Sequence, residues 1–131
     1  MVALQIGDAL RECNPTSDHH VWIICTRPDM AGKIVLLNMT SRRRGSDQTC
    51  LLLKGDHPTV THPTVINFRE GWVRPLERVE WLVQSRALQH EPAASFTLLD
   101  RMRKGALLSR FTPPDIKAAI AACIWPLPEV K

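Results

Sequence analysis

Short runs of apolar, β-branched and aromatic residues alternate with turn-forming segments through the first 75 positions of the chain. The run HVWIICT at residues 20–26 is typical of a β-strand, because branched and aromatic side chains pack well on a pleated surface. Proline, aspartate and glycine between the runs supply the turns. We therefore predict six short strands, the second and third paired as a hairpin, at residues 6–10, 20–26, 33–40, 49–54, 64–68 and 72–74.

The period of the apolar positions changes after Pro75. Leu76, Val79, Leu82 and Val83 fall on one face of a helix. Two further stretches share this helical period. They comprise Phe96, Leu99, Met102, Arg103, Ala106 and Leu107 in the first and Ile116, Ala119, Ile120, Cys123 and Ile124 in the second.

Capping residues precede the second and third predicted helices. Ser95 is a candidate N-cap of the second helix, because a serine hydroxyl accepts a backbone N–H at that position. Before the third helix, Thr112 can serve as the cap and Pro113 suits the first helical position. Asp115 can reach back toward Thr112 as in a capping box.

Strands followed by helices predict an α+β fold, a small antiparallel β-barrel with C-terminal helices. The chain has 131 residues, which is the size of one domain and enough to bury a core without disulfides. We expect a single domain at residues 1–131. Its barrel core spans residues 6–75 and its helical extension spans residues 76–125.

Composition excludes several classes of protein. Hydrophobic residues make up 44% and charged residues 23% of the chain, as in an ordinary globular domain. The longest apolar run, residues 118–125, is too short to span a bilayer, and no signal-peptide pattern opens the chain. The four cysteines form no C-x-x-C pair, and Cys25 and Cys123 lie at apolar positions typical of buried free thiols. We therefore expect a reduced, cytoplasmic protein without disulfides.

Positive charge is concentrated in one part of the chain. The formal net charge is +4, and residues 27–54 alone contain six basic and two acidic side chains. A local excess of this kind suits a partner that carries phosphate groups. It is equally compatible with an ordinary solvated surface, so charge alone does not decide between the two.

Three segments resemble the MazF/PemK family of bacterial toxins. The first is Gly7-Asp8-Ala9-Leu10 followed by Asn14-Pro15-Thr16, similar to the family's Gly-Asp start and Asp-Pro loop. The second is IVLLNMTS at residues 34–41, similar to an apolar family strand that ends in Thr or Ser. The third is TVINFREGWVRPLERVEWLV at residues 64–83, similar to the closing strand and helix of the family. The resemblance covers residues 6–85 and leaves residues 86–131 unassigned.

The resemblance implies an SH3-like barrel that acts as a metal-independent endoribonuclease on single-stranded RNA. It also implies a homodimer that a partner antitoxin silences. Family members use an Arg before the second strand and a Thr or Ser at the end of the third. Thr40 or Ser41 matches the second position, whereas His19 and His20 stand where an Arg-Pro pair is expected. This departure implies either lost activity or a different acid/base pair.

The residues themselves suggest such a pair. Cleavage of RNA by internal transfer needs a base for the 2′-OH proton, an acid for the leaving 5′-oxygen and positive charge on the phosphate. Histidine suits both proton roles, because its ordinary pKa of about 6.5 lies near neutral pH. We therefore predict that His19 or His20 acts with His57. The predicted phosphate and RNA contacts are Thr40, Ser41, Arg42, Arg43, Arg44 and Lys54.

Other residues and other functions are also compatible with this sequence. We expect a structural role for His62 and core positions for Trp22 and Trp72, although Trp72 could instead stack on a base. Cysteine and histidine spacings match no zinc motif, and no nucleotide-binding glycine loop is present, so we predict no metal and no cofactor. Two alternatives stay open: a non-catalytic SH3-like module that binds RNA or a protein, and a dimerisation scaffold whose helical extension is the working surface.

Overall fold

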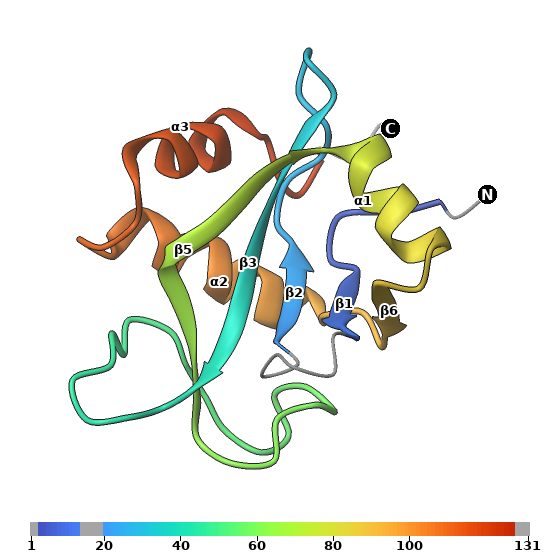
Figure 1. Ribbon diagram of the computed structural model, residues 1–131. Coiled ribbons are helices and arrows are strands. Elements are labelled where there is room, and N and C mark those ends of the chain that lie inside the picture. The colour runs from blue at the N-terminus through green and yellow to red at the C-terminus, as the bar shows by residue number, and fades with distance from the viewer. Residues whose placement is uncertain (1–2, 14–19, 128–131) are drawn as a thin grey trace.

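The computed structural model describes residues 3–13 and 20–127, which form a curled antiparallel sheet and three helices (Figure 1). Six strands follow one another across the sheet in the order β4-β5-β3-β2-β1-β6. The strands are β1 (Ala9–Glu12), β2 (Val21–Ile24), β3 (Lys33–Ser41), β4 (Leu51–Leu52), β5 (Thr64–Pro75) and β6 (Leu88–Glu91). The helices are α1 (Leu76–Gln84), α2 (Phe96–Leu108) and α3 (Pro114–Ala122). The predicted α+β class with antiparallel strands is confirmed, and the strands form a curled sheet.

The central hairpin forms where the sequence predicts it. β2 and β3 are antiparallel neighbours, with Val21 opposite Met39. The Asp29 carboxylate orders the turn between them, because its Oδ1 accepts the backbone N–H groups of Ala31 and Lys33, both at 2.9 Å. An aspartate that bonds backbone two residues ahead is a common device for a tight turn.

Two predicted strands are one strand in the structure. Residues 64–68 and 72–74 both belong to β5, which runs along β3 with a register shift near its middle. Gly71 lies in that part of β5. A Cβ atom there would stand 2.4 Å from Cδ1 of Ile116, so glycine leaves the room that α3 needs against the sheet.

The strand β6 was not predicted, and it corrects the expected organisation of the chain. It pairs with β1, with Leu10 opposite His90, inside the region expected to be a helical extension. Its sequence LQHE has no β-branched residue, and Gln89 and His90 are exposed, so no apolar alternation marks it. The predicted strand at residues 49–54 is also shorter than expected, since β4 holds only Leu51–Leu52.

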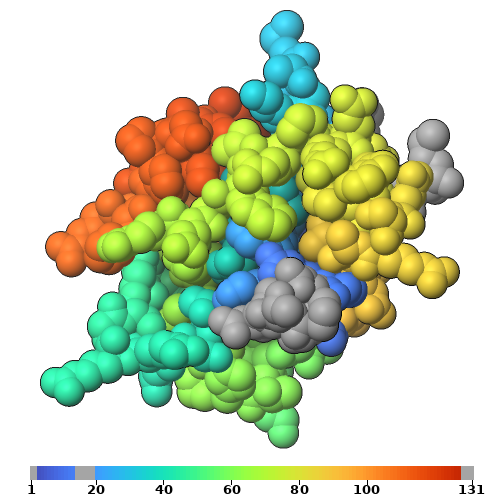
Figure 2. Space-filling model, in the orientation of Figure 1, coloured from blue at the N-terminus to red at the C-terminus, as the bar shows by residue number. Residues whose placement is uncertain are grey.

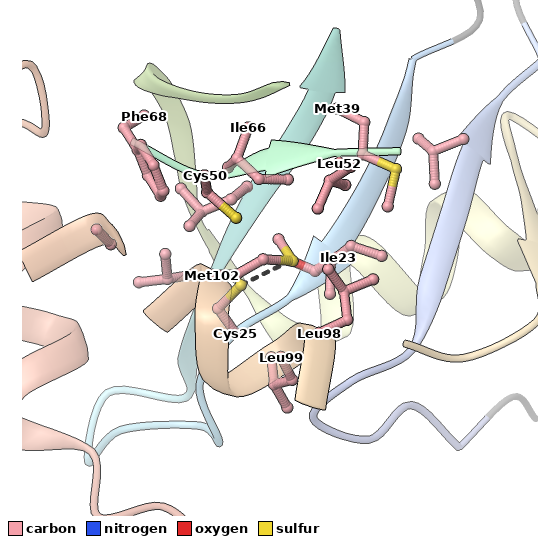
Figure 3. Packing of buried hydrophobic residues seen from close by; sticks show 14 of the residues in the cluster. Ile23, Cys25, Met39, Cys50, Leu52, Ile66, Phe68, Leu98, Leu99 and Met102 are labelled. Atoms are coloured by element: carbon pink, nitrogen blue, oxygen red, sulfur yellow. Dashed lines mark hydrogen bonds between the residues drawn. The ribbon is translucent and has the colours of Figure 1, made fainter. Parts of the chain in front are cut away.

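The two faces of the sheet are covered by different helices. α2 and α3 cover one face, and Figure 3 shows Leu98 and Met102 of α2 turned toward Ile23, Ile66 and Phe68 of the sheet. α1 covers part of the other face, where the fully or nearly buried residues are Leu10, Trp22, Ile24, Ile34, Leu36, Val79 and Leu88.

Both tryptophans singled out in the sequence pack on the α1 face. Trp22 is buried, and Trp72 is half-buried against the same cluster. Their rings stack with centroids 3.7 Å apart and planes 14° apart. The Nε1–H of Trp22 donates to Oε1 of Glu12 at 2.8 Å, which satisfies the polar end of the buried ring. The predicted core position of Trp22 is confirmed.

One of the two predicted helix caps is present. Ser95 caps α2, since its Oγ accepts the backbone N–H of Leu98 at 3.1 Å. The prediction for Thr112 was wrong. The N-cap position of α3 is held by Pro113 without a side-chain hydrogen bond, so Asp115 completes no capping box. The hydroxyl of Thr112 is buried without a hydrogen-bond partner among the described residues.

A buried arginine fixes α3 to the sheet. Arg103 of α2 is 8% exposed, and its guanidinium donates to three backbone carbonyls. One belongs to Cys25, directly after β2, and the others to Ile120 and Cys123 at the C-terminal end of α3. A cation suits this place because unpaired carbonyls give a helix C-terminus a partial negative charge.

The four cysteines are free thiols, as the sequence predicted. Cys25 and Cys50 are buried, whereas Cys123, expected to be buried, is partly exposed. Burial raises the pKa of Cys25 to about 12 and that of Cys50 to about 11. Within the described part of the chain, every helix is too short or too polar to traverse a lipid bilayer.

Candidate functional site

A cavity of about 330 Å³ opens where β2 begins, β3 ends and the chain enters β5. Two imidazoles, four hydroxyl groups and one guanidinium belong to the residues around it. The described lining residues are His20, Val21, Met39, Thr40, Ser41, Arg43, Thr59, Val60, His62 and Thr64. The antiparallel register explains this gathering, because β3 ends beside the start of β5, with Thr40 opposite Val65 and Ser41 opposite Thr64.

His20 is oriented by the end of β3. Its ring Nδ1 lies 3.2 Å from the carbonyl oxygen of Met39. A carbonyl oxygen only accepts hydrogen bonds, so this contact places the proton of a neutral ring on Nδ1. Nε2 then carries the lone pair, and no described residue bonds to it. Such a nitrogen can accept a proton from a bound molecule.

His62 is the second imidazole of the cavity, and the sequence predicted only a structural role for it. Its Nε2 lies 2.7 Å from Oγ of Ser41, and its Nδ1 lies 3.2 Å from Oγ1 of Thr61. Pairing of Ser41 with Thr64 carries residue 62 past the end of β3, which brings the two side chains together. The signal available in the sequence was the His-Pro-Thr-Val segment directly before a strand, which places a histidine at the rim of a sheet.

His57 does not reach the cavity, so the predicted pairing of His57 with His20 is not formed. It is 3% exposed, and both ring nitrogens are engaged. Nδ1 accepts the backbone N–H of Thr59 at 3.2 Å and lies 2.7 Å from its Oγ1. Nε2 therefore carries the proton and donates to the carbonyl oxygen of Pro92 at 2.6 Å. This histidine joins the loop after β4 to the segment after β6, the two edge strands of the sheet.

The structure separates the predicted RNA-contacting residues into two groups. Thr40, Ser41 and Arg43 line the cavity with His20. Arg42, Arg44 and Lys54 are exposed but lie outside its lining. His19 falls outside the described residues.

The described lining of the cavity has a positive net charge, because Arg43 is cationic and none of the other described lining residues is acidic. Asp47, in the loop after β3, is held by Ser109, whose hydroxyl donates to Oδ2 at 2.6 Å. Partial burial raises the pKa of this carboxyl. Hydrogen bonds from Ser109 and Thr49, together with the nearby Arg110, outweigh that effect and hold the pKa below its usual value.

Within residues 3–13 and 20–127, no three His, Cys, Asp or Glu side chains lie together as the ligands of a metal ion would. The arrangement instead offers proton transfer and anion binding through imidazole, hydroxyl and guanidinium groups. Comparisons with family models, with curated proteins and with solved structures return no match.

Proposed function

We propose that this cavity binds single-stranded RNA and cleaves it without a metal ion. The observation that carries the proposal is the meeting of His20, His62, Arg43 and the hydroxyls of Thr40 and Ser41 around one cavity whose described lining has no acid. A phosphodiester flanked by a ribose 2′-OH presents the groups that such a set can serve. It has a proton to remove, an oxygen to protonate and an anionic centre to hold.

The reaction would be an internal transfer. The 2′-oxygen attacks the neighbouring phosphorus while Nε2 of His20 takes its proton. The bond from phosphorus to the 5′-oxygen breaks, and the imidazolium form of His62 gives that oxygen a proton and becomes a neutral ring. The products are a 2′,3′-cyclic phosphate and a free 5′-hydroxyl, so atoms and charge balance. Arg43 and Thr40 hold the phosphate oxygens, and Ser41 orients His62 through the 2.7 Å contact.

The curled sheet and the three resembling segments support the further proposal of an SH3-like, MazF/PemK-type toxin. On this proposal the protein works in the cytoplasm as a homodimer that an antitoxin restrains. Gly7 contributes local support. It has a positive φ of 93°, and its N–H donates to the carbonyl of Ile24 at 2.7 Å, so the Gly-Asp start closes against the hairpin. In place of the family's Arg, His20 provides the proton acceptor.

The test uses purified protein, a long single-stranded RNA and a chelator. We expect fragments with cyclic phosphate ends. His20→Ala and His62→Ala should each lower kcat/KM by about 10²- to 10⁴-fold, the usual contribution of a general acid or base. His90→Ala is the matched control, because His90 is exposed on β6 and lies outside the cavity lining. It should cleave RNA as the parent does.

The pH profile separates the two roles. Loss of a general base removes the fall in rate toward low pH, so this limb should disappear in His20→Ala and persist in His62→Ala. Equal cleavage by the parent and both folded variants would refute the mechanism. Intact RNA that still binds the parent, with affinity falling as salt rises, would instead indicate the non-catalytic binding module.

A further inference from the structure

An aromatic ring carrying two arginines lies at the corner between α2 and α3, away from the cavity. The guanidinium carbon of Arg69, in β5, lies 4.6 Å from the ring centroid of Phe111. That of Arg110 lies 4.8 Å from the same centroid. Both arginines are exposed, while Phe111 is half-buried. A ring in this position orients the guanidinium groups and lowers the entropy lost when they bind a ligand.

Neither arginine forms an ion pair with a described residue, although the Asp47 carboxylate lies near enough to Arg110 for the charge of the arginine to lower its pKa. The ion pairs among the described residues use Arg11, Arg101 and Lys104 instead. Neither Arg69 nor Arg110 donates a hydrogen bond to another described side chain or carbonyl. The neighbouring Glu70 accepts a 3.3 Å hydrogen bond from Asn67. The N–H groups of both guanidiniums are therefore available to an anion.

The corner is physically joined to the basic loop beside the cavity. Ser109, the residue before Arg110, donates to Asp47 of that loop at 2.6 Å. The same loop carries Arg43, which lines the cavity. In Figure 2 the loop after β3 (green-cyan), the middle of β5 (yellow-green) and the α2–α3 corner (orange) adjoin along the left of the view. The loop that carries Arg43 is thus in contact with the corner that carries Arg110.

We infer that Arg69, Arg110 and Phe111 form a second RNA-binding site, which holds the strand where it leaves the cavity. The ligand is a backbone phosphate, which a guanidinium fork binds in a bidentate manner, and bases can stack on the guanidinium planes. A linear polyanion fits because the cavity, the basic loop and the corner follow one another over the surface. This inference rests on the proposed function, since it takes its substrate from the cavity.

The test compares a dinucleotide with an oligonucleotide of about a dozen nucleotides. Only the longer substrate reaches the corner. The double variant Arg69→Gln/Arg110→Gln should cleave the dinucleotide as the parent does and bind the oligonucleotide at least about tenfold more weakly. The slope of log K against log salt should become shallower by about 1.4, or about 0.7 for each phosphate contact removed. Phe111→Leu should weaken binding about two- to fivefold while the slope is kept.

Arg78→Gln provides the matched control. Arg78 lies 4.5 Å from the ring centroid of Trp81 on α1, so this variant also removes an arginine from an aromatic ring. It should bind as the parent does. Equal affinity and salt slope in the double variant and in Arg78→Gln would overturn the inference while RNA cleavage by the parent remained intact. If the double variant lost dinucleotide cleavage as strongly as it lost oligonucleotide binding, the arginines would act at the cavity itself. That result would also contradict the inference. A parent that neither binds nor cleaves RNA would remove the proposed function together with this site.

Discussion

The assignment of His57 to the closure of the fold predicts a large loss of stability when its ring is removed. In His57→Ala two hydrogen bonds disappear, the one from Nε2 to the Pro92 carbonyl and the one that Nδ1 accepts from Thr59, whose N–H and hydroxyl share this nitrogen. Each contributes about 1 kcal/mol net. Removal of a ring that is 3% exposed adds about 1–2 kcal/mol for lost packing. The expected decrease in the free energy of unfolding is therefore about 3–4 kcal/mol.

Urea unfolding followed by circular dichroism measures this loss, and thermal unfolding should show a decrease in Tm of about 10 °C. His57→Gln keeps a donor that can reach Pro92, so we expect about half of the loss. His62→Ala serves as the control, because His62 is exposed and its removal should change stability by less than about 0.5 kcal/mol. A His57→Ala protein as stable as the parent, or a folded one that loses RNA cleavage alone, would refute the structural role.

Two further predictions concern the buried polar groups. Arg103→Met removes the guanidinium that three carbonyls share, and we expect the free energy of unfolding to fall by about 2–4 kcal/mol; an unchanged urea midpoint would contradict this. Burial raises the pKa of Cys25 to about 12 and that of Cys50 to about 11, above the ordinary value of 9.0. The folded protein keeps protons that the unfolded chain releases, so stability should decline as pH rises from about 9, by up to about 1.4 kcal/mol per pH unit for each thiol. Urea titrations at several alkaline pH values should show a gentler decline in Cys25→Ala, and identical profiles would disprove the linkage.

Local pattern in the sequence predicts the elements that alternation and helical period mark. The β2–β3 hairpin and the Ser95 cap were predicted because each depends on residues close together in the chain. β6 was not predicted, because an edge strand with exposed Gln89 and His90 needs no apolar alternation. Its pairing with β1 depends on residues about 80 positions earlier, which no local pattern reveals.

The sequence predicts only part of the candidate site, because local pattern shows where strands end but not which distant segments close against each other. His20, Thr40 and Ser41 lie at strand ends that one hairpin and its neighbour bring together, so their proximity follows from the predicted pairing. His57, expected in the site, is buried outside the cavity lining, whereas His62, expected to be structural, is one of the lining residues. A sequence shows two similar His-Pro-Thr-Val segments, whereas only the closure against Pro92 decides which imidazole is buried.

The pairing of β6 with β1 has a consequence for where the chain can be divided. The resemblance to the toxin family stops at about residue 85, yet the ladder partner of the N-terminal strand begins at Leu88. A protein cut at that boundary would leave β1 with an unprotected edge, a template for association with other chains. It would also lack α2, whose Met102 is wholly enclosed between the helix and the sheet. Residues 6–85 are thus not a self-sufficient folding unit, because the segment that follows them is an integral part of the domain.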